Sequence, residues 1–174
     1  TKPEHVFNGI SALRAVPGRL ESISEEQDFH VFVDYAHTDS ALETILRLIR
    51  TMPHKRIITV IGCGGDRDKT KRGPMGIAAC RGGDLAIFTS DNPRSEEPSA
   101  ILNDIETGVR GAGLQNYKII GDRAEAIAVA ISEARSGDVV LIAGKGHEDY
   151  QILRDQTIPF DDRLAAREAL KSLK

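Results

Sequence analysis

Short apolar runs alternate with segments of helical periodicity along most of this chain. Runs of strand length occupy residues 29–33, 56–61, 85–90 and 138–143, and a shorter run occupies 117–120. Between them apolar residues recur at helical spacing, as Leu42, Leu46 and Ile49 do within residues 40–52. The pattern therefore predicts strands at the runs and helices at 40–52, 74–80, 99–109 and 123–134.

Near-continuous apolar strands that alternate with helices are typical of a parallel sheet covered on both faces. We predict an α/β fold with a doubly wound, mostly parallel, Rossmann-like sheet, helices on both faces and a C-terminal hairpin strand. A short strand at 20–23 precedes the first buried run, and residues 150–153 and 157–160 form the predicted hairpin. Asp161 is placed to cap a last helix that ends near residue 173.

The sequence Val16-Pro17-Gly18 breaks the helical pattern near the start of the chain. Before it, residues 4–14 predict a short helix. We expect residues 1–15 to be the tail of a preceding domain and residues 16–174 to form one domain with a full core. Because residue 1 is Thr, we expect the chain to be a processed or excised fragment.

Composition narrows the class of partner. The net charge is −3 over 174 residues with both signs interspersed, which predicts no surface for nucleic acid or an anionic membrane. No apolar run approaches the length of a membrane span, and we see no signal peptide. Cys63 and Cys80 fit a reducing cytosol, so we expect a cytoplasmic protein; a reactive thiol at Cys63 is a weak alternative to two buried thiols.

Polar clusters follow four of the predicted strands, at residues 34–38, 62–68, 91–94 and 144–148. The carboxyl ends of parallel strands share one edge of a sheet, where ligands bind. Asp91-Asn92-Pro93-Arg94 is the most informative cluster, because Pro93 stiffens a loop that carries a carboxylate, an amide and a guanidinium. Such a loop suits a small zwitterion, although any single cluster could be an ordinary turn.

Two phosphate-binding patterns are absent from the sequence. Gly62, Gly64 and Gly65 do not complete G-x-G-x-x-G, because Arg67 occupies the position of the third glycine. No G-x-x-x-x-G-K-[ST] loop occurs, so the chain cannot cradle β- and γ-phosphates in the P-loop manner. A non-catalytic, Rossmann-like nucleotide-binding module is a weak alternative, in which Asp91 would be the acid at the end of the next strand.

Two histidines stand close to carboxylates in the sequence. His37 follows Asp34 by three residues, and His147 precedes Glu148. No Ser or Cys is arranged with either histidine as a nucleophile, and neither pair has metal-ligand spacing. We predict no catalytic residue and no bound metal in this chain, and we expect the histidines to contact a ligand or to be structural.

Five motifs, at residues 18–21, 34–38, 64–68, 91–94 and 144–148, resemble in order the C-terminal domain of the Mur ligase family. The resemblance implies an ADP-forming ligase of peptidoglycan synthesis that uses ATP and Mg²⁺ to activate UDP-N-acetylmuramoyl-dipeptide as an acyl phosphate. It implies that residues 1–15 end the central ATPase domain, which holds the P-loop and Mg²⁺, and that residues 16–174 bind the amino acid. The piece alone is then expected to be inactive.

Within the family, residues 91–94 are similar to the ligases that add meso-diaminopimelate, because lysine-adding relatives lack an arginine at the position of Arg94. The resemblance implies that Arg94 grips the distal carboxylate through two parallel hydrogen bonds. It also implies amino-acid contacts from Arg67, Asp91, Asn92, Gly144 and Glu148, with Glu148 accepting from the distal ammonium and Arg67 holding the other carboxylate. The simpler alternative is that Arg94 caps Glu96 or Glu97.

On the nucleotide side, the resemblance implies that Asp34 contacts the ribose, that His37 lies near the adenine or ribose and that Arg19 reaches the terminal phosphates. Asp39 departs from the proline usual in the family, which could loosen the start of the following helix. Lys69 and Arg72 are further cations within reach, although a solvated helix start explains them equally well. The C-terminal domain of a folate polyglutamate ligase is a further alternative, against which residues 91–94 argue.

Overall fold

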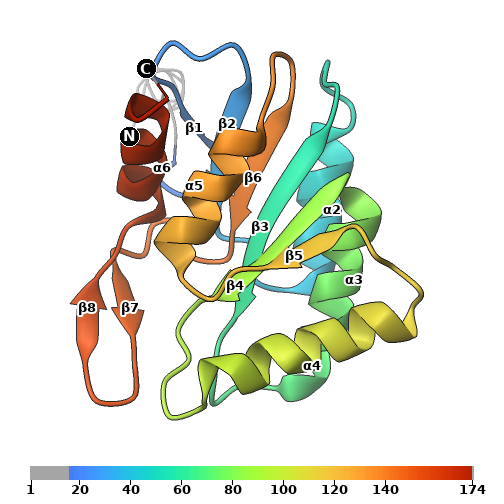
Figure 1. Ribbon diagram of the computed structural model, residues 1–174, viewed down its shortest axis with the longest axis vertical. Coiled ribbons are helices and arrows are strands. Elements are labelled where there is room, and N and C mark those ends of the chain that lie inside the picture. Colours follow the sequence, from blue (N-terminus) through green and yellow to red (C-terminus); the bar gives the residue numbers. More distant parts are fainter. Residues whose placement is uncertain (1–15, 174) are drawn as a thin grey trace, which may run out of the picture.

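The computed structural model describes residues 16–173, so the predicted helix at 4–14 and the tail 1–15 lie outside the described residues. A six-stranded sheet in the order β1-β2-β6-β3-β4-β5 forms the centre (Figure 1). Its strands are β1 (Glu21–Ile23), β2 (His30–Asp34), β3 (Ile57–Cys63), β4 (Leu85–Ser90), β5 (Tyr117–Ile119) and β6 (Val139–Ala143). All neighbours are parallel except β1, which pairs antiparallel with β2 at one edge. The predicted mostly parallel sheet is confirmed.

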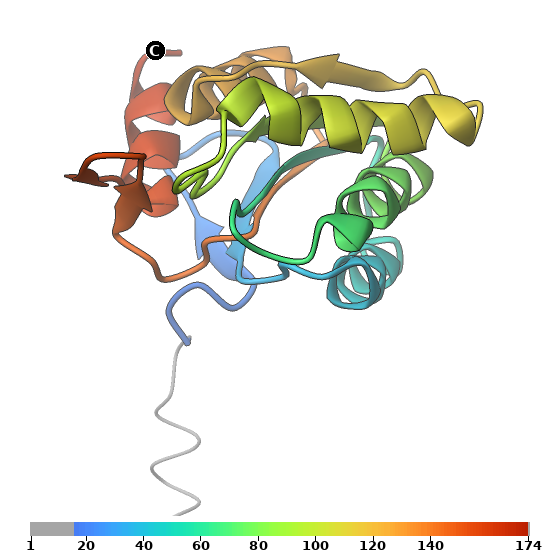
Figure 2. The same cartoon turned by 90° about the horizontal axis from the view of Figure 1, so that it is seen from below.

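Helices cover both faces of this sheet, as Figures 1 and 2 show. One face packs against α2 (Asp39–Ile49), α3 (Arg72–Gly82) and α4 (Pro98–Gly111), and the other against α5 (Arg123–Glu133) and α6 (Asp162–Lys171). A short 3₁₀ helix, Lys69–Lys71, leads into α3. The predicted hairpin is present as β7 (Tyr150–Ile152) and β8 (Thr157–Pro159), but it forms a separate two-stranded sheet.

Side-chain caps explain where several helices begin. Asp161 Oδ1 accepts a hydrogen bond from Arg163 N at 2.8 Å, which confirms the predicted cap of α6. Thr38 caps α2 in the same way, with its Oγ1 3.2 Å from Ala41 N. Asp39 is the first residue of α2, where a carboxylate is favourable near the positive end of the helix dipole. The departure at Asp39 therefore leaves the helix start intact.

The register of the parallel strands brings their carboxyl ends to one edge of the sheet. Asp34 at the end of β2 pairs with Ala143 at the end of β6, and Cys63 pairs with Ser90 at the ends of β3 and β4. The chain runs from β2 through β3 and β4 to β5, and then returns to insert β6 between β2 and β3. This change of direction opens a crevice between loops at that edge, which is the usual ligand position in such folds.

Candidate functional site

The loops that follow β2, β3, β4 and β6 enclose a space of about 580 Å³, called here the central hollow. Its wall contains all the residues predicted for the amino acid, namely Arg67, Asp91, Asn92, Arg94, Gly144 and Glu148. Three segments far apart in the sequence thus supply one wall, as parallel strands ending at one edge require. Their juxtaposition is observed, and their contacts with an amino acid stay a prediction.

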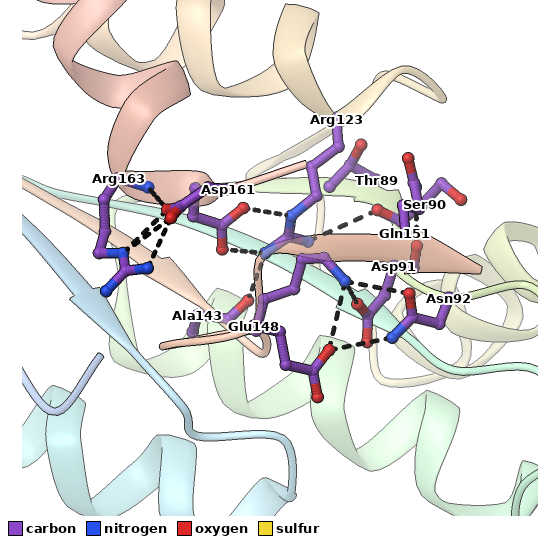
Figure 3. A network of polar contacts seen from close by, with 12 residues as sticks. Thr89, Ser90, Asp91, Asn92, Arg123, Ala143, Glu148, Gln151, Asp161 and Arg163 are labelled. Atoms are coloured by element: carbon purple, nitrogen blue, oxygen red, sulfur yellow. Dashed lines mark hydrogen bonds and ion pairs between the residues drawn. The ribbon is translucent and has the colours of Figure 1, made fainter. Parts of the chain in front are cut away.

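A buried ammonium group holds three of these side chains together (Figure 3). Lys145 has no exposed surface, and its Nζ lies 3.1 Å from Asp91 Oδ1, 3.0 Å from Asn92 Oδ1 and 3.4 Å from Glu148 Oε2. Asn92 Nδ2 donates to the same Glu148 oxygen at 3.1 Å. A buried charge is tolerated when it is paired and hydrogen-bonded, and Lys145 meets both conditions.

The β7–β8 hairpin fixes the loop at residues 91–94 from the other side. Gln151 Nε2 donates to the main-chain oxygen of Asp91 at 2.7 Å, and Ile152 N donates to Asn92 Oδ1 at 2.9 Å. The main-chain N–H of Arg94 donates back to Ile152 O at 3.1 Å. The hairpin therefore holds the loop at residues 91–94 in place through hydrogen bonds.

Arg94 reaches into the central hollow without an acidic partner. Its NH1 donates to Gly65 O at 2.8 Å and to Asn92 O at 3.3 Å. Within residues 16–173 it forms no ion pair, so Glu96 and Glu97 do not cap it as the simpler alternative required. Two backbone carbonyls orient the guanidinium, whose charge interacts with Asp66 only at longer range, so it can still form an ion pair with an anion.

Arg67 and Arg72 lie on the same wall but differ in their partners. Arg67 is exposed, and among the described residues its guanidinium donates only to the carbonyl of Asp66, at 3.3 Å. Arg72 is buried and pairs with Glu96 at 2.8 Å and Asp104 at 2.8 Å. Hydrogen bonds from Arg72 are the largest cause that lowers the pKa of Glu96 to about 2. Arg72 is thus a structural cation, whereas Arg67 stays open to a ligand.

The glycines at 62–65 are required by close packing between loops. Gly65 N donates to Asn92 O at 2.9 Å, and a Cβ on Gly65 would lie 1.9 Å from Pro93 O. A Cβ on Gly62 would lie 2.6 Å from Thr89 O. Only glycine allows such an approach of two backbones. Loop packing accounts for these glycines without a phosphate, which removes the main support for the dinucleotide alternative.

A second space of about 590 Å³, called here the lateral hollow, lies beside α2. It brings together the three residues predicted for the nucleotide, namely Arg19, Asp34 and His37. Apolar side chains also line it, among them Leu20, Ala41, Ile45 and Leu48, together with the hydroxyl-bearing Ser40 and Thr44. Tyr35 and His37 line both hollows, so the two spaces are neighbours that share one partition.

The partition is built around the ring of Tyr35. The guanidinium carbon of Arg19 lies 4.8 Å from the ring centroid, and the rings of His37 and His147 lie 4.7 Å and 5.3 Å away. Gly18 has φ of +65°, and a Cβ there would lie 2.1 Å from His147 N. Both histidines thus pack against Tyr35, and the loop that carries Arg19 is held against residues 146–147.

Asp34 is more deeply engaged than its predicted role suggested. It is 4% exposed, its Oδ2 accepts from Leu20 N at 2.7 Å, and its Oδ1 accepts from Ala36 N at 2.8 Å. These bonds fix the segment before β1 and the loop after β2. A carboxylate has four lone-pair sites, so a ribose could reach Asp34 only through those that remain.

A buried ion pair supports the carboxyl end of β6, where Figure 3 labels Arg123 and Ala143. Arg123 Nε and NH2 each lie 2.7 Å from an oxygen of Asp162, and both side chains are fully buried. Arg123 NH2 also donates to Ala143 O at 3.1 Å. The pair joins the first residues of α5 and α6 to the end of β6, immediately before Gly144.

The described residues show no sign of a reactive thiol at Cys63, of a metal-binding cluster or of a membrane-spanning helix. Burial raises the pKa of the Cys63 thiol to about 12, with Asp91 adding to the shift, so the thiolate needed for nucleophilic reactivity does not form near neutral pH. Residues 16–173 contain no group of three or more His, Cys, Asp or Glu side chains placed to hold a metal ion. Among the helices described there, none has the length and apolar character to cross a membrane.

Sequence reasoning gave no role to Lys145, Tyr35 or Arg123, although it quoted the first two within motifs. One signal was available for Lys145, which stands between two glycines directly after an apolar strand. Nothing local marked Arg123, because its partner Asp162 lies 39 residues away in sequence.

Comparison with known proteins gives a consistent result. A family model described as "Mur ligase, glutamate ligase domain" matches residues 18–146. The UDP-N-acetylmuramoyl-L-alanyl-D-glutamate–2,6-diaminopimelate ligase of Solibacter usitatus (strain Ellin6076) is 53% identical over 169 residues, which is 97% of this chain and 34% of that protein. The ligase of the same name from Geobacillus thermodenitrificans (strain NG80-2) is 54% identical over 166 residues, 95% of this chain and 34% of that one. The chain thus spans about a third of the length of these relatives.

Solved structures agree. A structure of a UDP-N-acetylmuramoyl-L-alanyl-D-glutamate–2,6-diaminopimelate ligase superposes with a TM-score of 0.84 at 38% identity, covering 99% of this chain and 35% of that one. The Mycobacterium tuberculosis folylpolyglutamate synthase complexed with ADP and AMPPCP gives a TM-score of 0.61 at 18% identity, covering 99% of this chain and 35% of that chain. The second likeness shows the fold alone, so the folate ligase alternative rests on a more distant neighbour.

Proposed function

Because the chain belongs to the Mur ligase family, we propose that it is the C-terminal, amino-acid-binding domain of an ADP-forming ligase. The proposed reaction joins meso-2,6-diaminopimelate to UDP-N-acetylmuramoyl-L-alanyl-D-glutamate in peptidoglycan synthesis. Relatives at 53% and 54% identity that carry the name of this ligase support it. The structural observation that carries the proposal is the central hollow, where an arginine without an acidic partner lies on the same wall as two carboxylates.

The amino acid would be read by charge. The free edge of the Arg94 guanidinium would bind the distal carboxylate, and Glu148 with Asp91 would accept hydrogen bonds from the distal ammonium. Lysine lacks the distal carboxylate and would leave Arg94 unpaired in the hollow. A site built to bind a polar group can reject an analogue that lacks it by on the order of 10⁴-fold.

The other predicted contacts would hold the end of the amino acid that reacts. Arg67, exposed at the mouth of the hollow, would bind the second carboxylate beside the attacking amine. Gly144 has φ of +119° and lines the hollow, where its carbonyl is proposed to accept from the ammonium. Asn92 would contribute through the second N–H of its amide, because the first is used by Glu148.

The lateral hollow is the proposed place for part of the ATP. Arg19 and His37 are exposed there, and Ile45 and Leu48 offer an apolar surface of the kind that a flat base requires. Arg19 would reach towards the phosphates from a loop held by Gly18 and Asp34. The neighbouring hollows would then bring the amino acid and the nucleotide together at Tyr35.

The rest of the ligase would supply the groups that this chain lacks. In the proposed reaction ATP phosphorylates the peptide carboxylate and ADP leaves; the incoming amine then attacks the acyl phosphate, the amide bond forms and phosphate is released. No P-loop pattern occurs in the sequence. We therefore propose that residues 1–15 end a central ATPase domain that binds ATP and Mg²⁺, and that residues 16–174 form the C-terminal domain. We place the reaction in the cytoplasm, where its nucleotide substrates would be available.

The test is a phosphate-release assay of the full-length ligase with ATP and UDP-N-acetylmuramoyl-L-alanyl-D-glutamate. We expect kcat/KM for meso-diaminopimelate to exceed that for L-lysine by about 10³-fold or more, and the isolated chain to be inactive. Equal use of the two amino acids, or turnover only with a folate acceptor and glutamate, would overturn the proposal.

A further inference from the structure

Lys145 is buried beside the central hollow but does not line it. It is 0% exposed, and the ring centroid of Tyr150 lies 5.6 Å from its Nζ. Tyr150 itself belongs to the wall of the hollow, as do Asp91 and Glu148. An amino acid in the hollow would therefore touch the partners of Lys145 and not its ammonium group.

In each of the carboxylates of Asp91 and Glu148, one oxygen contacts Lys145 and the other does not. Asp91 Oδ1 lies 3.1 Å and Glu148 Oε2 3.4 Å from the ammonium nitrogen, and Glu148 Oε2 also accepts from Asn92. Within residues 16–173, Asp91 Oδ2 and Glu148 Oε1 accept no hydrogen bond. Figure 3 shows the second oxygen of Glu148 pointing away from the network. Each carboxylate thus keeps one oxygen for a donor in the hollow.

The charges of the cluster also match one additional cation. Asp91 and Glu148 carry two negative charges, and Lys145 compensates one of them by direct contact. Arg123 also interacts with both carboxylates at longer range, but its own charge is balanced by the buried Asp162. The remaining single negative charge is what one ammonium group of a ligand would neutralise. Without Lys145 the two carboxylates would face each other with no cation in contact, and neighbouring like charges disfavour each other's ionised form.

We propose that Lys145 is a positioning residue that makes the central hollow selective for a second ammonium group. It holds Asp91 and Glu148 so that one oxygen of each faces the ligand, and it leaves the pair with one net negative charge. The inference rests on the proposed function, because it takes an amino acid with a distal ammonium as the occupant of the hollow. It goes further in assigning the choice between one and two amino groups to a side chain outside the wall.

The experiment compares two ligands that differ only in the distal amino group, namely meso-diaminopimelate and 2-aminopimelate. Steady-state kinetics of the full-length ligase would be measured for wild type, Lys145→Met and the control Lys118→Met. Lys118 is exposed on the outer strand β5, pairs with Glu133 at the end of α5 and lines neither hollow. Circular dichroism would check that each variant is folded.

We expect wild type to prefer meso-diaminopimelate by about 10- to 100-fold, the range of hydrogen bonds to a charged group. Lys145→Met should reduce this preference by about tenfold or more through KM for the diamino acid, with KM for ATP unchanged. In a Glu148→Gln background the further loss on Lys145→Met should be smaller, because one of the two carboxylates through which Lys145 acts is gone. Lys118→Met should keep the preference. If Lys145→Met does not fold, Lys145→Gln, which keeps a donor but no charge, serves in its place.

The outcomes separate the two proposals. If Lys145→Met or Lys145→Gln leaves the preference for meso-diaminopimelate intact, or lowers kcat/KM equally for both ligands, the role of Lys145 is overturned. The proposed function then still stands. A wild-type ligase that does not use meso-diaminopimelate overturns the proposed function and the inference with it.

Discussion

Two kinds of arginine lie near the central hollow: those paired with carboxylates stabilise the fold, and those without an acidic partner are available to bind a ligand. Arg72 and Arg123 are buried, and each binds carboxylates at 2.7–2.8 Å. Arg67 and Arg94 donate to backbone carbonyls and form no ion pair within the described residues. A guanidinium saturated by carboxylates stabilises the fold, whereas one oriented by carbonyls is ready for an anionic ligand.

The largest expected effect concerns an unpaired arginine. Arg94→Ala in the full-length ligase should lower kcat/KM for meso-diaminopimelate by about 10²- to 10⁴-fold, because two charge-assisted hydrogen bonds to the ligand carboxylate are lost. KM for ATP should change little. Arg110→Ala is the matched control, since Arg110 is exposed on α4 and its one ion pair within residues 16–173 is with Glu106. A larger effect on ATP than on the amino acid would contradict the role of Arg94.

The opposite behaviour is expected of a paired arginine. Arg123→Met should lower the free energy of unfolding by about 3–5 kcal/mol, because Asp162 would be left buried without a partner. Urea denaturation followed by circular dichroism measures the loss. Under conditions where Arg123→Met is folded, the full-length variant should keep the wild-type ratio of kcat/KM for meso-diaminopimelate to that for lysine.

A double variant sharpens this second case. Arg123→Met with Asp162→Leu removes both charges and should recover much of the lost stability. If Arg123→Met instead abolished the amino-acid preference in folded protein, the division between supporting and recognising arginines would fail.

The smallest expected effect is a pH dependence of the stability that the Arg72–Glu96 pair contributes to the fold. Arg72 is the main cause that lowers the pKa of Glu96 from its ordinary value of 4.5 to about 2. A carboxyl group with a lowered pKa stabilises the fold above its unfolded-state value, and this contribution fades as pH falls from about 4.5 to about 2. Glu96→Gln should therefore be less stable than wild type at pH 6, and the difference should shrink at pH 3.

Chemical denaturation at the two pH values measures this effect. Glu97→Gln is the matched control, because the exposed neighbour Glu97 takes no part in the Arg72 cluster. A Glu96→Gln variant as stable as wild type at pH 6 would show that the pairing contributes nothing.

The fold could be predicted from the sequence because strands, helices and caps are marked by apolar spacing and capping residues within short segments. The apolar run at 85–90 became β4 without a change of boundary, and Asp161 capped the helix that it was expected to cap. Parallel strands then required the loops after β2, β3, β4 and β6 to meet, so the gathering of the candidate site was predictable too.

The partners of charged groups were not predictable, because they depend on distant contacts. Lys145 meets Asp91 and Asn92 across more than 50 positions of sequence. Arg72 meets Asp104 only because α3 packs against α4, and so the sequence could not separate it from a solvated cation. Burial and pairing decide whether such a residue supports or recognises, and both arise from tertiary packing.

Isothermal titration calorimetry of this chain with meso-diaminopimelate and with L-lysine tests the central claim most directly. The account predicts weak but measurable binding of meso-diaminopimelate, because the domains proposed to close the site are missing, and no binding of lysine at the same concentrations. Lysine bound as tightly as meso-diaminopimelate would contradict the claim that Arg94 selects the amino acid.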